Sequence, residues 1–369
     1  MKKVMFMIPN LKGGGAEKVL VDILNNINKK KFEITLILLQ NDGVFINELS
    51  EGIDIKFLNK KGKLIEKIQT ILIKYLPSLF YRIKIREKYD VEVAFLEGKA
   101  AKLISKSNNK SSRKFVWIHT DLKNFNWIKN IFFSKKDEEK CYSKFNDIVF
   151  VSNEAKDAFE NIYYNKSKKH VIYNPIIDKD IISKSINYTL EKKDSLNLVS
   201  VGRLVKVKGF DRLIKIHSKI VKEYPHNLII VGDGIEKENL IKLIENLNVN
   251  ESVKLVGFKK NPYPYIRQSD IYICSSYAEG FSLSVLEAVI LKKAILSMDV
   301  TGPREILDFG EYGVLCKDES ELEKNLKDLL NNREKIKYYE NRSAILSKKF
   351  NYKRIIKQIE NLIDAKGEL

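Results

Sequence analysis

Two carboxylates stand eight positions apart in the stretch SSYAEGFSLSVLEA, residues 275–288. Glu279 lies directly before a Gly-Phe-Ser triplet and Glu287 lies inside an expected helix, so that just over two helical turns span the distance between them. The apolar run DIYIC precedes the motif, which places it where a strand turns into a helix. Carboxylates are good acceptors for paired hydroxyl groups. The pair is therefore a candidate for binding a ligand that carries neighbouring hydroxyls.

Basic residues follow another apolar run, in the stretch GRLVKVKGF, which holds Arg203, Lys206 and Lys208. An arginine fork and a lysine point charge near a strand end are what a diphosphate requires. A solvated charged loop is the alternative interpretation.

Glycines open an expected helix after the first strand, in the stretch GGGAE, residues 13–17. Their amides and the helix N-terminus could hold an anionic group, with a plain tight turn as the alternative. The stretch matches neither GxGxxG nor GxxxxGK[ST], which counts against dehydrogenases and P-loop enzymes.

Metal and thiol chemistry have little support in the sequence. There is no HExxH motif or other close ligand pair, and no GxSxG elbow. The one Asp-x-Asp triplet, residues 178–180, falls in an expected linker, so we expect no metal site. The three cysteines, Cys141, Cys274 and Cys316, are far apart and are expected to be buried free thiols.

The elements that position these residues are short apolar runs that alternate with stretches of helical period. The runs are KVMFMIP, FEITLILLQ, DIKFL, VEVAFLE, KFVWIHT, DIVFVS and HVIYNP in the front half, and NLVSVGRL, NLIIVGDG, VKLVGF, DIYICSS, AILSMD and YGVLCK in the back half. This alternation predicts parallel sheets covered by helices on both faces. Two such series predict an α/β protein of two doubly wound domains.

The domain boundaries follow from the same pattern. We expect an N-terminal domain at residues 1–175, a C-terminal domain at 176–350, and a final helix at 351–369 that packs on either domain, the N-terminal one being preferred. The polar stretch 176–195 is expected to be a hinge. Ligands of open parallel sheets lie at the carboxyl ends of strands, where both charged motifs fall and where His119 follows the run VWI.

Length, composition and charge agree with a large ordered protein. The 369 residues suit two domains, and 44% hydrophobic with 31% charged residues excludes a disordered chain. The apolar start is far shorter than the roughly 20 residues that span a bilayer, so we expect a cytoplasmic protein. Of the net charge of +18, residues 1–175 carry +13 (33 Lys+Arg against 20 Asp+Glu), which predicts a polyanionic partner for the front half.

Basic residues concentrate at positions 60–88, with nine Lys+Arg against two Glu. Apolar residues recur there every three or four positions, and Pro77 divides the stretch into two short helices. The recurring residues are Leu64, Ile68, Leu72, Tyr75, Leu79 and Ile83. A basic amphipathic segment suits the anionic face of a membrane, and a helix packed on the front sheet is the alternative.

Taken in order, GGGAEKV, GRLVKVKGFDRLI, VGDG, EGFSLSVLEA and TGPREIL resemble the GT-B glycosyltransferases, specifically the retaining family four of bacterial surface-polysaccharide, lipopolysaccharide and protein-glycan assembly. The resemblance runs from about residue 11 to 313. It implies two Rossmann-like domains that face each other across a cleft. It also implies transfer of a sugar from a nucleotide-diphosphate sugar, with a UDP-sugar expected, with retention and without a metal or other cofactor.

The resemblance also assigns residues of the second domain. Arg203 and Lys208 would bind the diphosphate, Glu279 would face the sugar as a catalytic residue, and Glu287 would hold the ribose. For Glu287 a solvated helix face is the alternative. The remaining donor-binding residues are Phe258 and Lys259 near the base, Gly280 and Phe281 beside the sugar, and the amides of Ser282 and Leu283. The variant GFSLSV leaves the identity of the donor sugar open.

In the first domain the resemblance places Gly14 and Gly15 near the donor phosphate and His119, the second catalytic candidate, near the sugar or acceptor. A buried, satisfied histidine is the alternative. The basic segment fits a lipid-diphosphate-linked acceptor, such as an undecaprenyl-linked glycan, on the inner face of the cell membrane. Two rival functions are a GT-B relative that acts on a free nucleotide-sugar, such as an epimerase, and a nucleic-acid binder. The spread of charge and the lack of a nucleic-acid motif disfavour the last.

Overall fold

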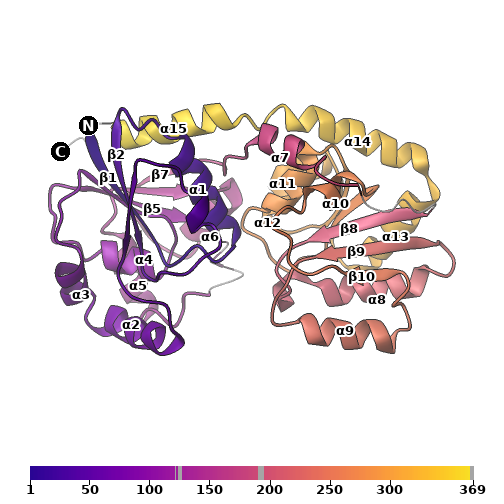
Figure 1. Ribbon diagram of the computed structural model, residues 1–369, viewed down its shortest axis with the longest axis horizontal. Coiled ribbons are helices and arrows are strands. Elements are labelled where there is room, and N and C mark those ends of the chain that lie inside the picture. Colours follow the sequence, from indigo (N-terminus) through magenta and orange to yellow (C-terminus); the bar gives the residue numbers. More distant parts are fainter. Residues whose placement is uncertain (121, 124–126, 190–194, 366–369) are drawn as a thin grey trace. The chain divides into compact units, whose positions relative to one another are not determined.

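The computed structural model describes residues 1–120, 122–123, 127–189 and 195–365, which form two compact α/β units (Figure 1). Unit 1 comprises Met1–Pro175 and the chain from Tyr352 onward, and unit 2 comprises Ile176–Asn351. Each unit has its own parallel sheet and its own hydrophobic core. The two doubly wound sheets predicted from the sequence are therefore present.

Unit 1 contains a sheet of seven described strands in the order β3-β2-β1-β4-β5-β6-β7, all parallel. Its strands are β1 Lys2–Ile8, β2 Phe32–Leu38, β3 Ile53–Phe57, β4 Val91–Ala94, β5 Arg113–Ile118, β6 Asp147–Phe150 and β7 Lys168–Val171. Its helices are α1 Gly15–Asn26, α2 Lys63–Tyr75, α3 Pro77–Lys84, α4 Lys99–Ile104, α5 Lys135–Tyr142, α6 Asn153–Glu160 and α15 Tyr352–Asp364. The strand order reverses between β1 and β4, which is where such sheets bind ligands.

Unit 2 contains a parallel sheet in the order β10-β9-β8-β11-β12-β13. Its strands are β8 Leu196–Val201, β9 His226–Val231, β10 Val253–Leu255, β11 Ile271–Cys274, β12 Ala294–Met298 and β13 Val314–Cys316. Its helices are α7 Asp178–Lys184, α8 Phe210–Ile220, α9 Lys237–Asn246, α10 Tyr263–Arg267, α11 Leu283–Ile290, α12 Thr301–Ile306, α13 Glu319–Asn331 and α14 Arg333–Ser347. Here the order reverses between β8 and β11, so the two charged loops predicted to bind the ligand follow neighbouring strands.

The stretch 176–195 differs from the expected hinge, because its described residues belong to unit 2. Residues 178–184 form α7, which packs on α10 and α11 and buries Ile181. Asn261 Nδ2 donates to the carbonyl of Lys184 at 2.8 Å, and Gln268 Nε2 donates to the carbonyl of Tyr188 at 3.0 Å. One buried apolar residue and these contacts to backbone carbonyls thus dock the segment on unit 2. Residues 190–194 lie outside the described part of the chain.

The three cysteines are free and buried, as predicted. Burial raises the pKa of the Cys141 thiol to about 12. Since the thiolate is the reactive form, this residue has a packing role rather than a chemical one.

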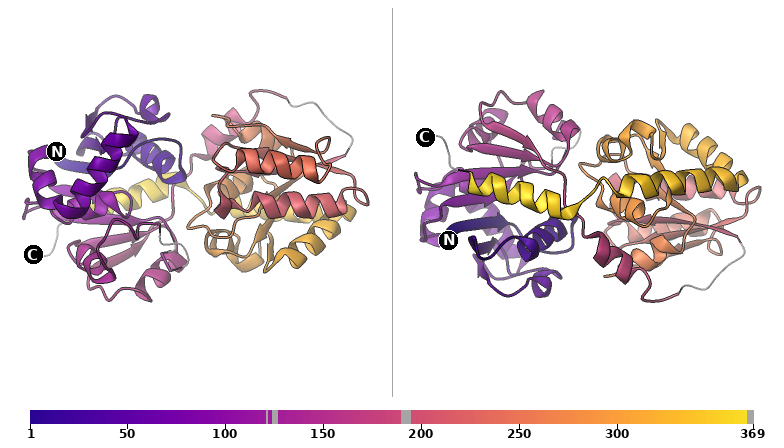
Figure 2. Two further views of the ribbon diagram at one scale, coloured as in Figure 1. Left: turned by 90° about the horizontal axis from the view of Figure 1, so that it is seen from below. Right: turned by 90° about the horizontal axis from the view of Figure 1, so that it is seen from above.

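Helix α15 runs along unit 1 (Figure 2), and its C-terminal end lies at the amino-terminal edge of the sheet. Lys2, at the start of β1, donates from Nζ to the carbonyls of Ile363 and Asp364, at 3.1 and 2.9 Å. Asn28 N donates to Glu360 Oε1 at 2.9 Å. The last carbonyls of a helix lack partners within it, so these contacts satisfy part of that end.

Arg113, at the start of β5, joins α15 to a buried carboxylate. Its Nε and Nη2 donate to Asp147 at 2.7 and 2.8 Å, and its Nη1 donates to the carbonyls of Leu362 and Ala365 at 3.1 and 2.9 Å. His170 Nε2 lies 2.8 Å from the same carboxylate. Burial raises the pKa of Asp147, but the bonds from His170 and Arg113 outweigh it and hold that pKa below its usual value.

Replacing this arginine should destabilise unit 1. Arg113→Ala leaves a buried carboxylate without its main cation, which costs about 3–5 kcal/mol of unfolding free energy. Both tryptophans, Trp117 and Trp127, lie in unit 1, so tryptophan fluorescence during urea denaturation follows this unit. Arg82→Ala, at an exposed position of α3, is the matched control and should change the unfolding free energy by less than about 0.5 kcal/mol. Equal denaturation midpoints for the two variants would contradict the role of Arg113.

Candidate functional site

The loops that follow β8 and β11 are bonded to each other at the carboxyl edge of the unit 2 sheet. Tyr277 N donates to the carbonyl of Val207 at 2.7 Å, and Ser275 Oγ donates to the carbonyl of Lys208 at 3.0 Å. Gly209 has a φ of 64°, and a Cβ there would overlap the carbonyl oxygen of Ser275. Only glycine therefore allows the two loops to approach this closely.

This contact brings two of the predicted site residues together. Lys208 Nζ donates to Glu279 Oε1 at 2.5 Å, and Ser276 Oγ donates to the same oxygen at 2.7 Å. The side chains of Lys208 and Glu279 are 21% and 11% exposed. The sequence assigned these residues to different parts of a donor, whereas in the structure they are partners of each other.

The same loops carry other positively charged or donor groups. Arg203 lies in the same loop as Lys208, is exposed, and makes no ion pair with the described residues. Ser282 begins α11 without a side-chain cap, so the first amides of that helix have no side-chain oxygen as partner. These groups together can bind an anion. Among the residues that the structure describes, no group of three His, Cys, Asp or Glu side chains is placed to hold a metal ion.

The TGPRE turn supports the loop that carries Glu279. A Cβ on Gly302 would lie 2.8 Å from Phe281 Cα and 3.0 Å from Ser282 N, so α12 packs directly against the loop backbone. Gly302 N donates to the carbonyl of Glu279 at 3.4 Å. Phe281 itself is buried, and Gly280 beside it is partly exposed. The turn and the phenylalanine therefore fix the position of the loop.

Glu287 and the loop after β10 lie elsewhere on the same unit. Glu287 is half-buried in α11, where Tyr263 Oη donates to its Oε1 at 3.3 Å, so it does not stand on a bare solvated face. Phe258 and Lys259 are exposed and follow β10, and Leu283 is the first residue of α11. The structure brings Lys208 and Glu279 into contact and places Arg203 in the same loop as Lys208.

The VGDG stretch, part of the family resemblance, ties neighbouring loops together. A Cβ on Gly232 would overlap the carbonyl oxygen of Gly202, and Leu204 N donates to the carbonyl of Asp233 at 2.9 Å. The stretch therefore sets the path of the loop that carries Arg203.

In unit 1, the predicted anion site at the start of α1 holds a side chain of the same helix. Gly14 is the N-cap and Gly15 is the first helical residue. A Cβ on Gly14 would overlap Glu17 Oε2, so this carboxylate lies over the N-terminus of α1. An acidic group is favoured there by the helix dipole.

His119 follows β5 and is 8% exposed. Its ring lies 5.0 Å from the ring of Phe95 and hydrogen-bonds the backbone of that residue, while Nε2 is buried and has no partner among the described residues. Burial lowers the pKa of His119 to about 3. The ring is therefore neutral near pH 7, with one nitrogen that can still accept a hydrogen bond.

Sequence reasoning missed Glu97, which lies beside His119 and is wholly buried. It accepts hydrogen bonds from His119 N at 2.9 Å, Thr120 Oγ1 at 2.5 Å and Trp127 Nε1 at 3.1 Å. A signal for it exists in the chain: Glu97-Gly98 follows β4 as Glu279-Gly280 follows β11, and both strands border the reversal of their sheets.

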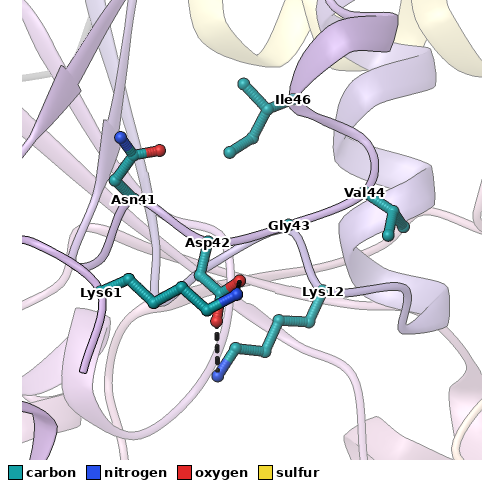
Figure 3. A pocket seen from close by; sticks show the side chains of 7 residues that line it. All are labelled: Lys12, Asn41, Asp42, Gly43, Val44, Ile46 and Lys61. Carbon is teal, nitrogen blue, oxygen red and sulfur yellow. Dashed lines mark ion pairs between the residues drawn. The ribbon is translucent and has the colours of Figure 1, made fainter. Parts of the chain in front are cut away.

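A polar pocket opens beyond β1, β2 and β3 in unit 1 (Figure 3). Its volume is about 360 Å³, and it is lined by Lys12, Asn41, Asp42, Gly43, Val44, Ile46 and Lys61. Lys12 and Lys61 both point at the carboxylate of Asp42, at 3.1 and 2.8 Å. The bond from Lys61, followed by that from Lys12, holds the pKa of Asp42 below its usual value although burial opposes them. Two lysines thus share one carboxylate at the rim of the sheet.

Sequence comparison relates the whole chain to glycosyltransferases. Residues 182–345, which lie in unit 2, match the family model of the glycosyl transferases group 1. An uncharacterized glycosyltransferase of Haemophilus influenzae is 26% identical over 98% of this chain and 100% of its own length. An N-acetylgalactosamine-N,N'-diacetylbacillosaminyl-diphospho-undecaprenol 4-alpha-N-acetylgalactosaminyltransferase of Campylobacter jejuni is 28% identical over 96% of this chain and 97% of its own length.

Solved structures have the same fold. Anabaena HepE, in complex with UDP and glucose, superposes with a TM-score of 0.80 over 99% of this chain and 100% of its own, at 20% identity. At that identity the match concerns the fold, and the sequence matches concern the family. The loops that carry Arg203, Lys208 and Glu279 lie in the region that matches the family model. The chain is thus similar to glycosyltransferases over nearly its whole length, its residues 182–345 match the group 1 family, and its fold is GT-B.

Proposed function

We propose that this glycosyltransferase moves a hexose or N-acetylhexosamine from a UDP-sugar to a lipid-linked glycan, with retention and without a metal ion. The observation that carries the proposal is the pair of Lys208 and Glu279, with Arg203 in the same loop as the lysine, where the unit 2 sheet reverses. The UDP bound to HepE and the diphospho-undecaprenol acceptor in the name of the Campylobacter relative support the choice of nucleotide and acceptor.

Donor binding would exchange ion-pair partners at this cluster. A diphosphate carries more negative charge than one carboxylate and attracts both Arg203 and Lys208, and the open start of α11 adds to the attraction. When Lys208 turns to the diphosphate, Glu279 loses its cation and can accept hydrogen bonds from the sugar hydroxyls. The pair in the structure would thus keep both groups in place until the donor arrives.

The chemical step would depend on charge stabilisation. The bond from the sugar's anomeric carbon to the diphosphate breaks, a hydroxyl of the acceptor forms the new bond, and its proton is released. Arg203 and Lys208 stabilise the leaving diphosphate, because groups fixed before the reaction need no reorganisation during it. Glu279 orients the sugar, and His119, neutral and with a free Nε2, would accept a hydrogen bond from a hydroxyl of the sugar or acceptor.

The acceptor would come from a membrane, since α2 and α3 expose an apolar surface. All six residues of the predicted apolar stripe are exposed, from 37% for Leu72 to 70% for Leu64. The helices contact unit 1 through other residues, among them Ile73, Phe80 and Tyr81. Large exposed apolar patches mark interaction surfaces, and with basic residues between them they suit an anionic bilayer. In the described part of the chain, no helix is both long and apolar enough to cross a bilayer.

The pocket of Lys12 and Lys61 would receive the anionic part of that acceptor. Lys61 lies two residues before α2, so the pocket adjoins the start of the apolar surface. A lipid diphosphate could replace Asp42 as the partner of both lysines while its chain follows α2 toward the membrane. This arrangement would explain why a strongly basic front half carries the acceptor side.

The first test is donor binding in the presence of EDTA. In a thermal-shift screen of UDP-, GDP-, ADP- and dTDP-sugars, UDP donors should stabilise the protein, and mass spectrometry should detect transfer. Arg203→Ala removes a charge-assisted bond of about 1.5–3 kcal/mol, so the Kd for UDP should rise roughly 10- to 150-fold. Lys222→Ala, at an exposed position beyond α8 and before β9, is the control and should leave the Kd unchanged. Transfer that returns only with added magnesium or manganese would exclude the metal-free mechanism.

The two glutamates of the opening motif should affect different kinetic constants. Glu279→Gln should lower kcat about 10- to 100-fold, because its charge meets the sugar that changes bonding. Glu287→Gln should mainly raise the KM for the donor, because the ribose changes little between ground and transition state. Both constants are measured with saturating acceptor after melting temperatures show intact folds. If Glu279→Gln keeps full kcat, Glu279 only supports the loop.

The surface of α2 and α3 should bind anionic vesicles. Reversing Lys60, Lys61, Lys63 and Lys67 to glutamate should weaken binding in a flotation assay by about 1 kcal/mol for each residue near the surface. The control reverses four exposed lysines elsewhere in unit 1, Lys30, Lys31, Lys110 and Lys166. If the two variants bind equally well, net charge rather than this surface governs attachment.

A further inference from the structure

Glu97 occupies the place in unit 1 where an open parallel sheet binds ligands. It follows β4, which neighbours β1 at the reversal of strand order. Gly98, with a φ of 92°, comes next and leads into α4, and a Cβ there would lie 2.9 Å from side-chain carbons of Ile128 and Ile131. Ile128 and Ile131 therefore pack tightly against this position.

The carboxylate is buried without a cation. Glu97 is 0% exposed and forms no ion pair with the residues that the structure describes. Burying a charge without a counter-charge is costly, and burial raises the pKa of Glu97. Its compensation is hydrogen bonding: three donors come from one stretch of chain, the amide of His119, the hydroxyl of Thr120 and the indole of Trp127.

This pattern differs from that of a second buried carboxylate, Glu92, which lies within β4. Glu92 is also 0% exposed, and burial raises its pKa too, but it accepts a hydrogen bond from Ser107 Oγ at 2.9 Å. Glu92 thus has the burial of Glu97 without a hydrogen bond to His119. The comparison separates the cost of burial from the effect of holding His119, Thr120 and Trp127 in place.

The bonds of Glu97 control where His119 lies. The hydrogen bond from its amide to Glu97 fixes the backbone of His119. The ring of His119 packs on Phe95, two residues before Glu97. Between these two contacts, the buried Nε2 has no partner in the described chain. The position of Nε2 therefore depends on Glu97 through the backbone of His119, although the carboxylate does not contact the imidazole ring.

We propose that Glu97 is a positioning residue, which holds His119, Thr120 and Trp127 in place and thereby directs the His119 ring toward the sugar or acceptor. The assignment rests on the proposed function, in which His119 binds a reacting partner. A misplacement of about 1 Å can cost of order 100-fold in rate, so an anchor that never touches substrate can still govern kcat.

The test compares Glu97→Gln, Glu97→Asp and the matched control Glu92→Gln in the full chain. The first readout is the NMR signal of the Trp127 indole N–H, identified with Trp127→Phe and needing no substrate. Glu97→Gln should shift this signal, because the amide presents a donor where one oxygen accepted, and Glu92→Gln should leave it unchanged.

The second readout is kcat with the UDP-sugar found in the screen. Glu97→Gln should lower kcat of order 100-fold with unchanged stabilisation by UDP, which binds to unit 2. Glu97→Asp keeps the charge and should recover part of the loss, and Glu92→Gln should stay within about twofold of the wild type.

Two results would overturn the assignment. An unchanged chemical shift of the Trp127 indole N–H in Glu97→Gln would show that the carboxylate does not hold Trp127 in place. Equal kcat values for Glu97→Gln and Glu92→Gln, at equal folded fractions, would show a purely structural role. If the wild type neither binds nor transfers any nucleotide-sugar, the proposed function fails separately, and the indole signal decides the anchor.

Discussion

Lys208 and Glu279 are 71 residues apart in the chain, and they meet because β8 and β11 are neighbours that end at the same edge of a parallel sheet. Every other feature of the unit 2 site follows from this edge. The backbone bonds between the two loops, the glycine at 209 and the packing of α12 all keep the lysine and the carboxylate within hydrogen-bonding distance. In a sheet with another strand order, Lys208 and Glu279 would follow strands that are not neighbours, and the two side chains would not meet.

Each unit carries an acidic residue after a strand that borders the reversal of its sheet, but the two carboxylates are compensated in different ways. Glu279 has a lysine as partner and remains partly accessible, so it can change partners. Glu97 is enclosed by hydrogen-bond donors and has no cation among the described residues, so it is suited to fix the positions of the residues that donate to it. One carboxylate thus fits a binding role and the other a structural support, because local packing rather than residue type decides accessibility.

The elements of the fold were largely readable from the sequence, whereas their contacts were not. All thirteen apolar runs form strands, since uniform short runs between helical stretches have few other solutions. Periodicity also marked the stripe of α2 and α3, but it could not tell that Leu64 and Ile68 face outward while Ile73 packs inward. The pairing of Lys208 with Glu279 depends on strand order, which no local pattern encodes. Glu97 was overlooked because the Glu-Gly pair after its strand gains meaning only when the strand order and the burial of the carboxylate are known.

Helix α15 has a consequence for the order in which the protein is made. The chain leaves unit 1 after Pro175, forms all of unit 2, and returns to unit 1 at Tyr352. Domains generally fold as they emerge from the ribosome, the N-terminal one first. Here unit 1 emerges first but lacks the helix whose carbonyls bind Lys2 and Arg113 until residues 352–364 are synthesised. The second unit can therefore reach its final form before the first, and a nascent chain would carry an incomplete unit 1 while residues 176–351 are synthesised.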